Sequence, residues 1–267
     1  MPNNQRTGSI LLSALFSTAF CMVHAQGIIE RCPTPARGTR VIHAAGSFAA
    51  WLRKVPLLPA NTPVLLYSGE RKYRQDVHAA VLDISVGSKD LQQCADAIMR
   101  LRAEYLFAQE RFDEIHFNFT SGFNAEFSRW AKGERIKVDG NRCSWVATGK
   151  PDLSHANLVS YLDKVFTYAG TLSLAKELRP AQDLPLEAGD VFIQGGSPGH
   201  AVIVMDVATL ADGRKAFLLA QSYMPAQQIH LLKNERHPEH GAWFVEGEDG
   251  QLYTPEWTFS WSDRKRW

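Results

Sequence analysis

The chain has 267 residues, 45% of them hydrophobic, with 29 Lys and Arg side chains against 28 Asp and Glu. This is the composition of an ordinary globular protein, long enough for one large domain or two small ones. The balanced charge argues against the strongly basic surface with which proteins bind nucleic acids or anionic membranes.

The N-terminus is typical of an export signal. Arg6 supplies a short basic region, and residues 9–23 form an apolar run that is short for a membrane span. The small residues of "VHAQG" predict cleavage after Ala25. We therefore expect a signal peptide over residues 1–25 and a single α+β domain over 26–267. The expected location is periplasmic or extracellular, with no membrane span in the mature chain.

The predicted elements follow an irregular lead-in over residues 27–40. In chain order, periodicity and turn residues predict a helix over 47–59, strands over 63–69 and 78–87, a helix over 90–109, a strand over 115–120, a helix over 124–133, strands over 134–138 and 143–147, a helix over 154–170, and strands over 190–196, 199–208 and 215–224. The tail over 250–261 is predicted to be an edge strand or an ordered cover. Helices that come early and antiparallel strands that come late predict an α+β fold.

The stretch "KDLQQC" places a cysteine at the start of the helix over 90–109. Asp90 as N-cap and Gln93 three residues later fit a capping box, so Cys94 would lie in the first turn. The free amide groups and the positive end of the helix dipole favour a thiolate there. A nucleophilic cysteine needs such help, because a thiol with a pKa of about 8.5 is mostly protonated at neutral pH. The alternative is that Cys94, which lies on the apolar face of the helix, only packs in the core.

A second polar constellation lies in the late strands. A Gly-rich turn places His200 at the first position of a hydrophobic strand, where rigid neighbours would hold a general base. Gln221 lies in the next strand and could face His200 across the sheet to orient its imidazole. Asp206, near the end of the His200 strand, is the competing orienting residue. The structural alternatives are that His200 is an ordinary histidine in a turn and that Gln221 is a buried amide without a catalytic role.

The order of these residues resembles that of papain-like cysteine hydrolases of bacterial cell walls, the NlpC/P60 and CHAP groups. The resemblance covers about residues 88–225 and rests on "QQCAD" and "AGDVFIQGGSPGHAVIV". It implies a central helix packed on an antiparallel sheet, with the helix carrying the nucleophile. The chain departs from that pattern in two ways: the interval from Cys94 to His200 is unusually long, and the third residue is not the common histidine.

Cys143 is an alternative nucleophile. Its "CSW" echoes a pattern of the CHAP group, and its interval to His200 is the more usual one. It is predicted to lie in a short strand, where no helix dipole is available, so Cys94 ranks first.

The whole chain resembles more closely a bacterial family known as domain of unknown function 4846. The resemblance runs from about Ser47 to the C-terminus, through "VGSKDLQQCADAIMRLRAEYLF", "IHFNFTSGF", "YAGTLSLAKEL", "LLAQSYMPAQQIH" and "LYTPEWTF". It implies a secreted or envelope protein and brings no established activity. It also implies that Cys94 belongs to the family's motif, whereas the position of Cys143 is often not a cysteine.

Together these features predict an exported cysteine hydrolase, a peptidase or amidase acting on cell-envelope peptides such as peptidoglycan. Cys94 would attack an amide carbonyl, and His200 would accept the thiol proton and return it to the leaving amine. The backbone N–H of Cys94, with Gln93 or Gln92, would stabilise the oxyanion.

The alternative function is that of a non-catalytic envelope protein of the same fold, which binds glycan, peptide or a partner protein. Aromatic residues would then line a binding groove: Phe117, Phe119, Phe123 and Trp130. The competing interpretation is that these rings pack in the core. No phosphate-binding glycine loop or dinucleotide motif occurs, and the pair His237 and His240 is a poor metal site, so we expect neither cofactor nor metal.

Overall fold

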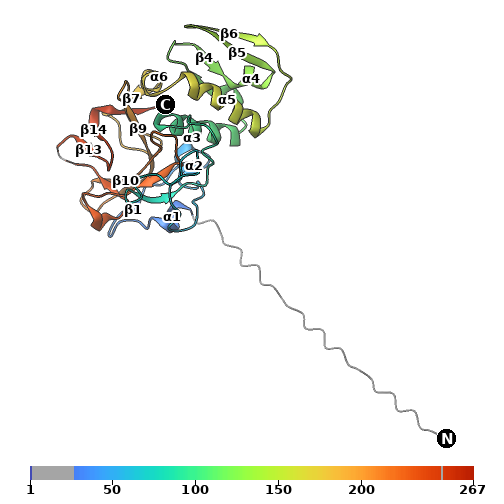
Figure 1. Ribbon diagram of the computed structural model, residues 1–267. Coiled ribbons are helices and arrows are strands. Elements are labelled where there is room, and N and C mark those ends of the chain that lie inside the picture. The colour runs from blue at the N-terminus through green and yellow to red at the C-terminus, as the bar shows by residue number, and fades with distance from the viewer. Residues whose placement is uncertain (2–26, 248) are drawn as a thin grey trace.

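The computed structural model of the protein describes Met1 and residues 27–247 and 249–267 (Figure 1). The predicted signal peptide, with its cleavage site after Ala25, lies outside the described residues apart from Met1. In the described part of the chain, no helix combines the length and the apolar character that a membrane crossing requires.

The helices differ greatly in length. The α-helices are α1 Ile28–Arg31, α2 Phe48–Leu52, α3 Cys94–Ala108, α4 Phe127–Ala131, α5 His155–Tyr168 and α6 Thr171–Glu177. Short 3-10 turns cover Phe112–Glu114, Pro238–His240 and Trp261–Asp263. The strands are β1 Thr39–Arg40, β2 His78–Val81, β3 His116–Asn118, β4 Asn124–Glu126, β5 Glu134–Asp139, β6 Arg142–Ala147, β7 Arg179–Pro180, β8 Val191–Gln194, β9 His200–Thr209, β10 Lys215–Gln221, β11 His230–Leu232, β12 Phe244–Val245, β13 Gln251–Tyr253, β14 Thr258–Ser260 and β15 Arg264–Arg266.

A nine-stranded antiparallel sheet dominates the structure. Its order is β2-β11-β10-β9-β8-β15-β7, with β1 paired to β9 and β12 paired to β10. Three hairpins, β3–β4, β5–β6 and β13–β14, form separate two-stranded sheets. Figure 1 shows β5 and β6 with α4 at the top of the molecule, away from β10.

Strand β9 is buried on both faces of the sheet, as its continuous apolar sequence predicts. Ile203 belongs to the larger hydrophobic core, which also contains Ile98 and Leu101 of α3. Val202 on the opposite face belongs to a second core with Phe259 of β14. The β13–β14 tail therefore covers the sheet face opposite α3, which agrees with its prediction as an ordered cover.

The expected papain-like α+β fold is wrong. That expectation placed a central helix on an antiparallel sheet between about residues 88 and 225. The nine-stranded sheet instead extends far beyond that interval, recruiting β1 and β2 before it and β11, β12 and β15 after it. Apart from α3 and α5 the helices are short. Strand partners distant in sequence decided the architecture, and local periodicity carries no information about them.

Two local predictions also need correction. Residues 63–69 do not form a strand and make only isolated bridges, from Leu65 to Arg71 and from Leu66 to Gln227. Residues 124–126, predicted to be helical, pair with β3 before α4 begins. In both places tertiary pairing overrode the local pattern.

Asp206 is held at the far end of β9. Its buried carboxylate accepts hydrogen bonds from Arg40 and from Arg53 Nε, the latter at 2.8 Å, and from the backbone N–H of Val207 at 2.8 Å. The two guanidinium groups come from β1 and from the residue after α2. This cluster ties the N-terminal segment to the centre of the sheet.

Replacing Asp206 with Ala should lower the free energy of unfolding by about 3–5 kcal/mol, because two partly buried guanidinium groups lose their counter-ion. The matched control is Asp212→Ala, which removes an exposed pair with Arg214 and should cost about 0–1 kcal/mol. Urea unfolding of both variants measures the difference. Equal small losses would show that the Asp206 cluster contributes nothing beyond a surface pair.

Candidate functional site

His200 opens β9 directly after a tight glycine turn. A side chain at Gly199 would lie 2.5 Å from Thr171 Oγ1 and 2.6 Å from the carbonyl oxygen of Gly196, so only glycine fits there. The turn is thus pressed against the start of α6. His200 itself is 1% exposed, which leaves its imidazole in a fixed, dry position.

A row of polar side chains leads away from the imidazole. His200 Nε2 lies 2.9 Å from Gln221 Oε1, and Gln221 Nε2 donates to Glu256 Oε2 at 2.6 Å. The other oxygen of Glu256 binds Lys72 Nζ at 2.6 Å. Four segments distant in sequence therefore meet in one connected row, which we call the His200 polar row (Lys72, Glu256, Gln221, His200).

The polar row determines which nitrogen of His200 carries the proton. A carboxylate paired with an ammonium group only accepts hydrogen bonds, so Gln221 must turn its NH2 toward Glu256 and its oxygen toward His200. His230 supports this orientation: its Nδ1 lies 2.9 Å from the Gln228 carbonyl, which leaves its Nε2, 3.4 Å from Gln221 Nε2, as an acceptor. His200 therefore donates through Nε2–H and keeps the lone pair on Nδ1.

Aromatic rings enclose the imidazole. Tyr223, Trp257 and Phe259 lie with ring centroids 4.8, 5.4 and 5.9 Å from that of His200. Trp257 is held in place by a 2.9 Å hydrogen bond from its Nε1 to Gln194 Oε1. Burial among these groups lowers the pKa of His200 to about 4, although the bond to Gln221 opposes the shift.

Cys94 is the first residue of α3, in the first turn as predicted, but with a different cap. Gln93 is the N-cap, and its backbone N–H donates to Asp96 Oδ2 at 3.0 Å. Asp90, the predicted N-cap, instead accepts from the backbone N–H of Ala226 at 2.6 Å. The helix therefore starts three residues later than a cap at Asp90 implies.

The thiol of Cys94 lies in the neighbourhood of His200. The backbone N–H of Ala201, the residue after His200, lies close enough to the Cys94 sulfur to lower the pKa of the thiol. The thiol also lies close enough to Tyr223 to affect its pKa, and Tyr223 contacts the His200 ring. Among the residues that the structure describes, no hydrogen bond joins the thiol to the imidazole directly.

Electrostatics keeps the thiol and the imidazole neutral. Burial, followed by the negative charge of Asp96, raises the pKa of Cys94 from 9.0 to about 11, against the smaller effect of backbone N–H groups. With the pKa of His200 lowered to about 4, the resting pair at neutral pH is a thiol and an uncharged imidazole. The thiolate expected from the helix start is therefore not the resting state.

The half-buried Cys94 opens onto a cleft of about 320 Å3, the Cys94 cleft. Its lining comes from three places: residues 90–91 and 93–96 at the start of α3, residues 169–172 at the start of α6, and the turn 196–199, with Thr120, Phe166 and Met224 closing the sides. This volume suits a side chain or a small group rather than a large cofactor.

Several predicted site residues lie elsewhere. Asp206 is bound by Arg40 and Arg53, and six residues of extended strand put it roughly 20 Å from His200, so it cannot orient that ring. Cys143 lies on β6, paired with Val138, and Figure 1 shows that hairpin far from β10. Neither residue joins the His200 polar row.

The two predicted oxyanion donors, Gln93 and Gln92, lie in different surroundings. Gln93 lines the Cys94 cleft, and its side-chain Nε2 donates to Asp90 Oδ1 at 3.1 Å. Gln92 is buried, accepts from Arg100 Nη1 at 3.1 Å and lines another cavity. Only Gln93 is placed near the thiol.

The aromatic residues proposed as a binding groove pack inside the molecule. Phe117, Phe119 and Trp130 are 1%, 1% and 7% exposed, and only Phe123 is partly exposed. Trp130 donates from Nε1 to Asn157 at 2.8 Å. These aromatic residues therefore belong to the core and do not line a binding groove.

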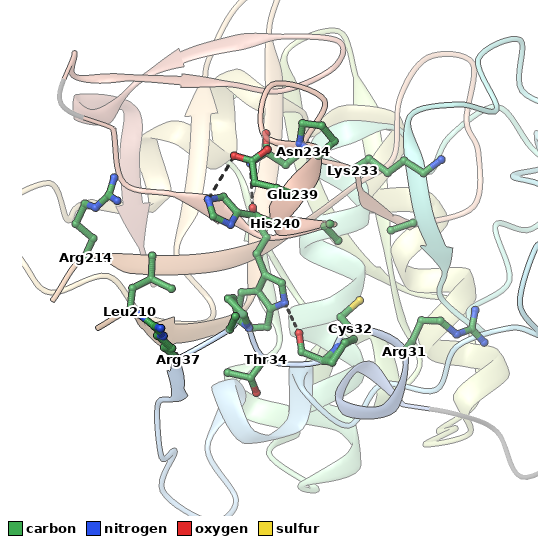
Figure 2. A pocket seen from close by; sticks show the side chains of 18 of the residues that line it. Arg31, Cys32, Thr34, Arg37, Leu210, Arg214, Lys233, Asn234, Glu239 and His240 are labelled. Atoms are coloured by element: carbon green, nitrogen blue, oxygen red, sulfur yellow. Dashed lines mark hydrogen bonds and ion pairs between the residues drawn. The ribbon is translucent and has the colours of Figure 1, made fainter. Parts of the chain in front are cut away.

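A larger cavity lies away from Cys94 and His200. It has a volume of about 1160 Å3 and is lined by residues 31–37, 210–212, 233–235 and 238–243 together with Ala79 and Arg214. Figure 2 shows Arg31, Arg37, Arg214 and Lys233 around it, and Glu239 turned toward His240. Within the described part of the chain, no group of three or more His, Cys, Asp or Glu side chains is arranged to hold a metal ion.

Sequence reasoning missed the outer half of the site. Lys72, Glu256, Tyr223 and Trp257 all surround His200 or its orienting amide, and none was a candidate. The family resemblance carried a signal for three of them: Tyr223 lies in "LLAQSYMPAQQIH", and Glu256 and Trp257 lie in "LYTPEWTF". Lys72 stands among other charged residues and carries no local signal.

The raised pKa of Cys94 has a kinetic consequence. Only the thiolate is alkylated, so iodoacetamide should modify Cys94 more slowly than Cys143 at about pH 7, and the rate at Cys94 should rise about tenfold per pH unit up to its pKa near 11. Mass spectrometry of tryptic peptides follows both cysteines in one sample. A rate at Cys94 that levels off below about pH 8 would mean that the thiolate is the resting form.

Comparison with known proteins yields a family. No curated protein and no solved structure matches the chain. The family described as Domain of unknown function (4846) matches residues 28–266, which include every member of the His200 polar row and the Cys94 cleft. The chain thus belongs to the family of Domain of unknown function 4846.

Proposed function

We propose that this protein is an exported cysteine hydrolase of amide bonds, with Cys94 as nucleophile, His200 as general base and Gln221 as the residue that orients it. The observation that carries the proposal is the His200 polar row beside a helix-start thiol. Any single acceptor would satisfy the one N–H of a buried neutral imidazole. Here a carboxylate–lysine pair additionally determines the orientation of that partner, which is the arrangement a general base requires.

The reaction starts from the neutral pair. As the sulfur of Cys94 forms a bond to the amide carbon, its proton passes to His200 Nδ1, and the Gln221 oxygen continues to accept from Nε2–H. The developing imidazolium is stabilised by the negative charge of Glu256, which already favours the protonated ring. Because no hydrogen bond joins the two groups at rest, substrate binding must bring them together, as is common for catalytic pairs.

The proton then leaves with the amine. His200 Nδ1–H protonates the amide nitrogen as the C–N bond breaks, which leaves a thioester on Cys94 and a neutral imidazole. A water molecule attacks the thioester with His200 as base, and release of the acid returns the thiol. Gln93 and the backbone N–H of Cys94 are the candidate donors to the oxyanion.

The substrate class proposed is a peptide amide of the cell envelope, such as peptidoglycan. Its support is the export signal expected from residues 1–25 and the small size of the Cys94 cleft, which suits short or branched peptides. The competing proposal is a binding protein without catalysis. The observation in its favour is the 1160 Å3 cavity distant from Cys94, large enough for a peptide segment.

Replacing Cys94 with Ala should lower hydrolysis of peptidoglycan-derived peptides by about 10³-fold or more, because the nucleophile is lost. Cys143→Ser is the matched control and should keep full activity. Liquid chromatography with mass spectrometry detects the products, and urea unfolding verifies that both variants fold. A Cys94→Ala protein as active as the parent would refute the assignment.

Removal of Glu256 tests the polar row. In Glu256→Ala the Gln221 amide is free to flip, so kcat/KM should fall by about 10²-fold through loss of base orientation. The side-chain 15N resonances of His200 should change from a single Nε2–H tautomer to a mixture. Glu235→Ala, which removes a surface pair with Arg74, is the control that should change neither. A single Nε2–H tautomer in Glu256→Ala would contradict the positioning role.

A further inference from the structure

We propose that the Cys94 cleft receives an aliphatic side chain of the substrate, with Leu172 and Met224 as the residues that contact it. This inference rests on the proposed function for its reaction and adds the substrate class, an amide that adjoins a residue with an aliphatic side chain. Three features of the cleft support it: the chemistry of its lining, the exposure of two large apolar side chains, and the bonds that hold both in place.

Apolar side chains contribute a large part of the cleft lining. They include Leu91, Phe166, Ala169, Leu172, Pro198 and Met224. Three glycines of the lining add only backbone, and its residues within the described chain include no Lys, Arg or His. A carboxylate or phosphate group of a ligand would therefore find no cationic partner in the cleft.

The two acidic residues of the lining do not make the interior of the cleft a site for cations. Asp96 is 6% exposed, and burial raises the pKa of its carboxyl well above the usual range, which favours the uncharged acid. Asp90 is exposed, and its Oδ1 already accepts from Ala226 N–H at 2.6 Å and from Gln93 Nε2 at 3.1 Å. The interior of the cleft therefore offers a ligand little charge of either sign.

Leu172 and Met224 are large apolar side chains that remain open to solvent in this cleft. They are 41% and 60% exposed. Single exposed apolar side chains are common on protein surfaces and indicate nothing by themselves. These two, however, line one cleft of about 320 Å3 together with the half-buried Cys94. An aliphatic side chain next to an amide attacked by Cys94 would cover them, and the removal of that apolar surface from water favours binding.

Leu172 is carried by a rigid part of the cleft wall. It lies in the first turn of α6, where Thr171 Oγ1 accepts from the backbone N–H of Gly196 at 3.3 Å. A side chain at Gly195 would lie 3.2 Å from Leu172 Cα, so this glycine turn packs directly against the start of the helix. The position of Leu172 is thus determined before a substrate arrives.

Met224 is held on the other side of the same thiol-bearing segment. Ser222 Oγ donates to the carbonyl oxygen of Gln92 at 2.8 Å, and the backbone N–H of Ala226 donates to Asp90. These two bonds fasten the loop that carries Met224 to the residues that lead into α3. The unbranched thioether itself can adapt to aliphatic groups of different shape. A cleft formed in advance lowers the entropic cost of binding such a group.

Neutral thiol reagents of different chain length test the proposal without requiring catalysis. The full chain is treated with methyl and with n-butyl methanethiosulfonate in the presence of N-acetylcysteine as the reference thiol, and peptide mass spectrometry follows Cys94. The ratio of butyl to methyl rates cancels the effect of the thiol pKa. It should be about tenfold or more higher at Cys94 than at N-acetylcysteine, because each methylene removed from water favours binding about fourfold.

The double substitution of Leu172→Ser and Met224→Ser should bring the ratio at Cys94 down to the value for N-acetylcysteine. Leu153→Ser is the matched control: it removes a leucine that is 55% exposed and lies outside the cleft, and it should leave the ratio unchanged. The wild-type ratio decides the proposal even if the double variant folds poorly. Equal ratios at Cys94 and the reference thiol, or a preference that survives the double substitution in a folded protein, would overturn it.

The labelling result separates this inference from the proposed function. A butyl preference at Cys94 without hydrolysis of any envelope peptide would support the aliphatic site and count against the hydrolase. Hydrolysis that depends on Cys94 without a butyl preference would support the hydrolase and overturn the aliphatic site.

Discussion

The candidate site depends on the carboxylate of Glu256. Its two oxygens bind Lys72 and Gln221, and the Gln221 amide in turn determines the tautomer of His200. The lysine comes before β2, the histidine and amide come from neighbouring central strands, and the carboxylate comes from the loop between β13 and β14. A buried row of this kind is stable only when every member is satisfied, so the tail must fold onto the sheet before the base is correctly oriented.

Burial and helix electrostatics oppose one another at Cys94, and burial is stronger. A helix N-terminus favours a negative charge by about 0.3–1 kcal/mol. The rise in the pKa of Cys94 from 9.0 to about 11 corresponds to about 3 kcal/mol against the thiolate. The same dry surroundings lower the pKa of His200. A thiol that is protonated at rest reacts slowly with electrophiles.

The aromatic segment illustrates why composition misleads about sites. The sequence allowed a binding groove at Phe117, Phe119 and Trp130, although such rings more often pack in the core, and the structure buries them. The rings that do surround the imidazole, Tyr223 and Trp257, stand singly in segments that suggested strands or a cover. Burial depends on which elements pack together, and a short stretch of sequence does not contain that information.

Local sequence determined several elements and the approximate places of three site residues. The helix over 94–108, the strands from β8 to β10 and the start of β9 at His200 follow from periodicity and turn residues, and so does a cysteine in the first turn of a helix. Neighbouring antiparallel strands made the approach of Gln221 to His200 predictable, since such strands pair by short hairpins. These features depend on contacts between residues close in sequence.

Only the tertiary structure decided the fold and the electrostatics of the site. The nine-stranded sheet gathers strands from both ends of the chain, which overturns the papain-like expectation. It placed Asp206 with Arg40 and Arg53, Cys143 on a distant hairpin, and Lys72 with Glu256 behind the imidazole. The reason is physical: a pKa or an orienting partner depends on desolvation and on neighbours brought from far along the chain.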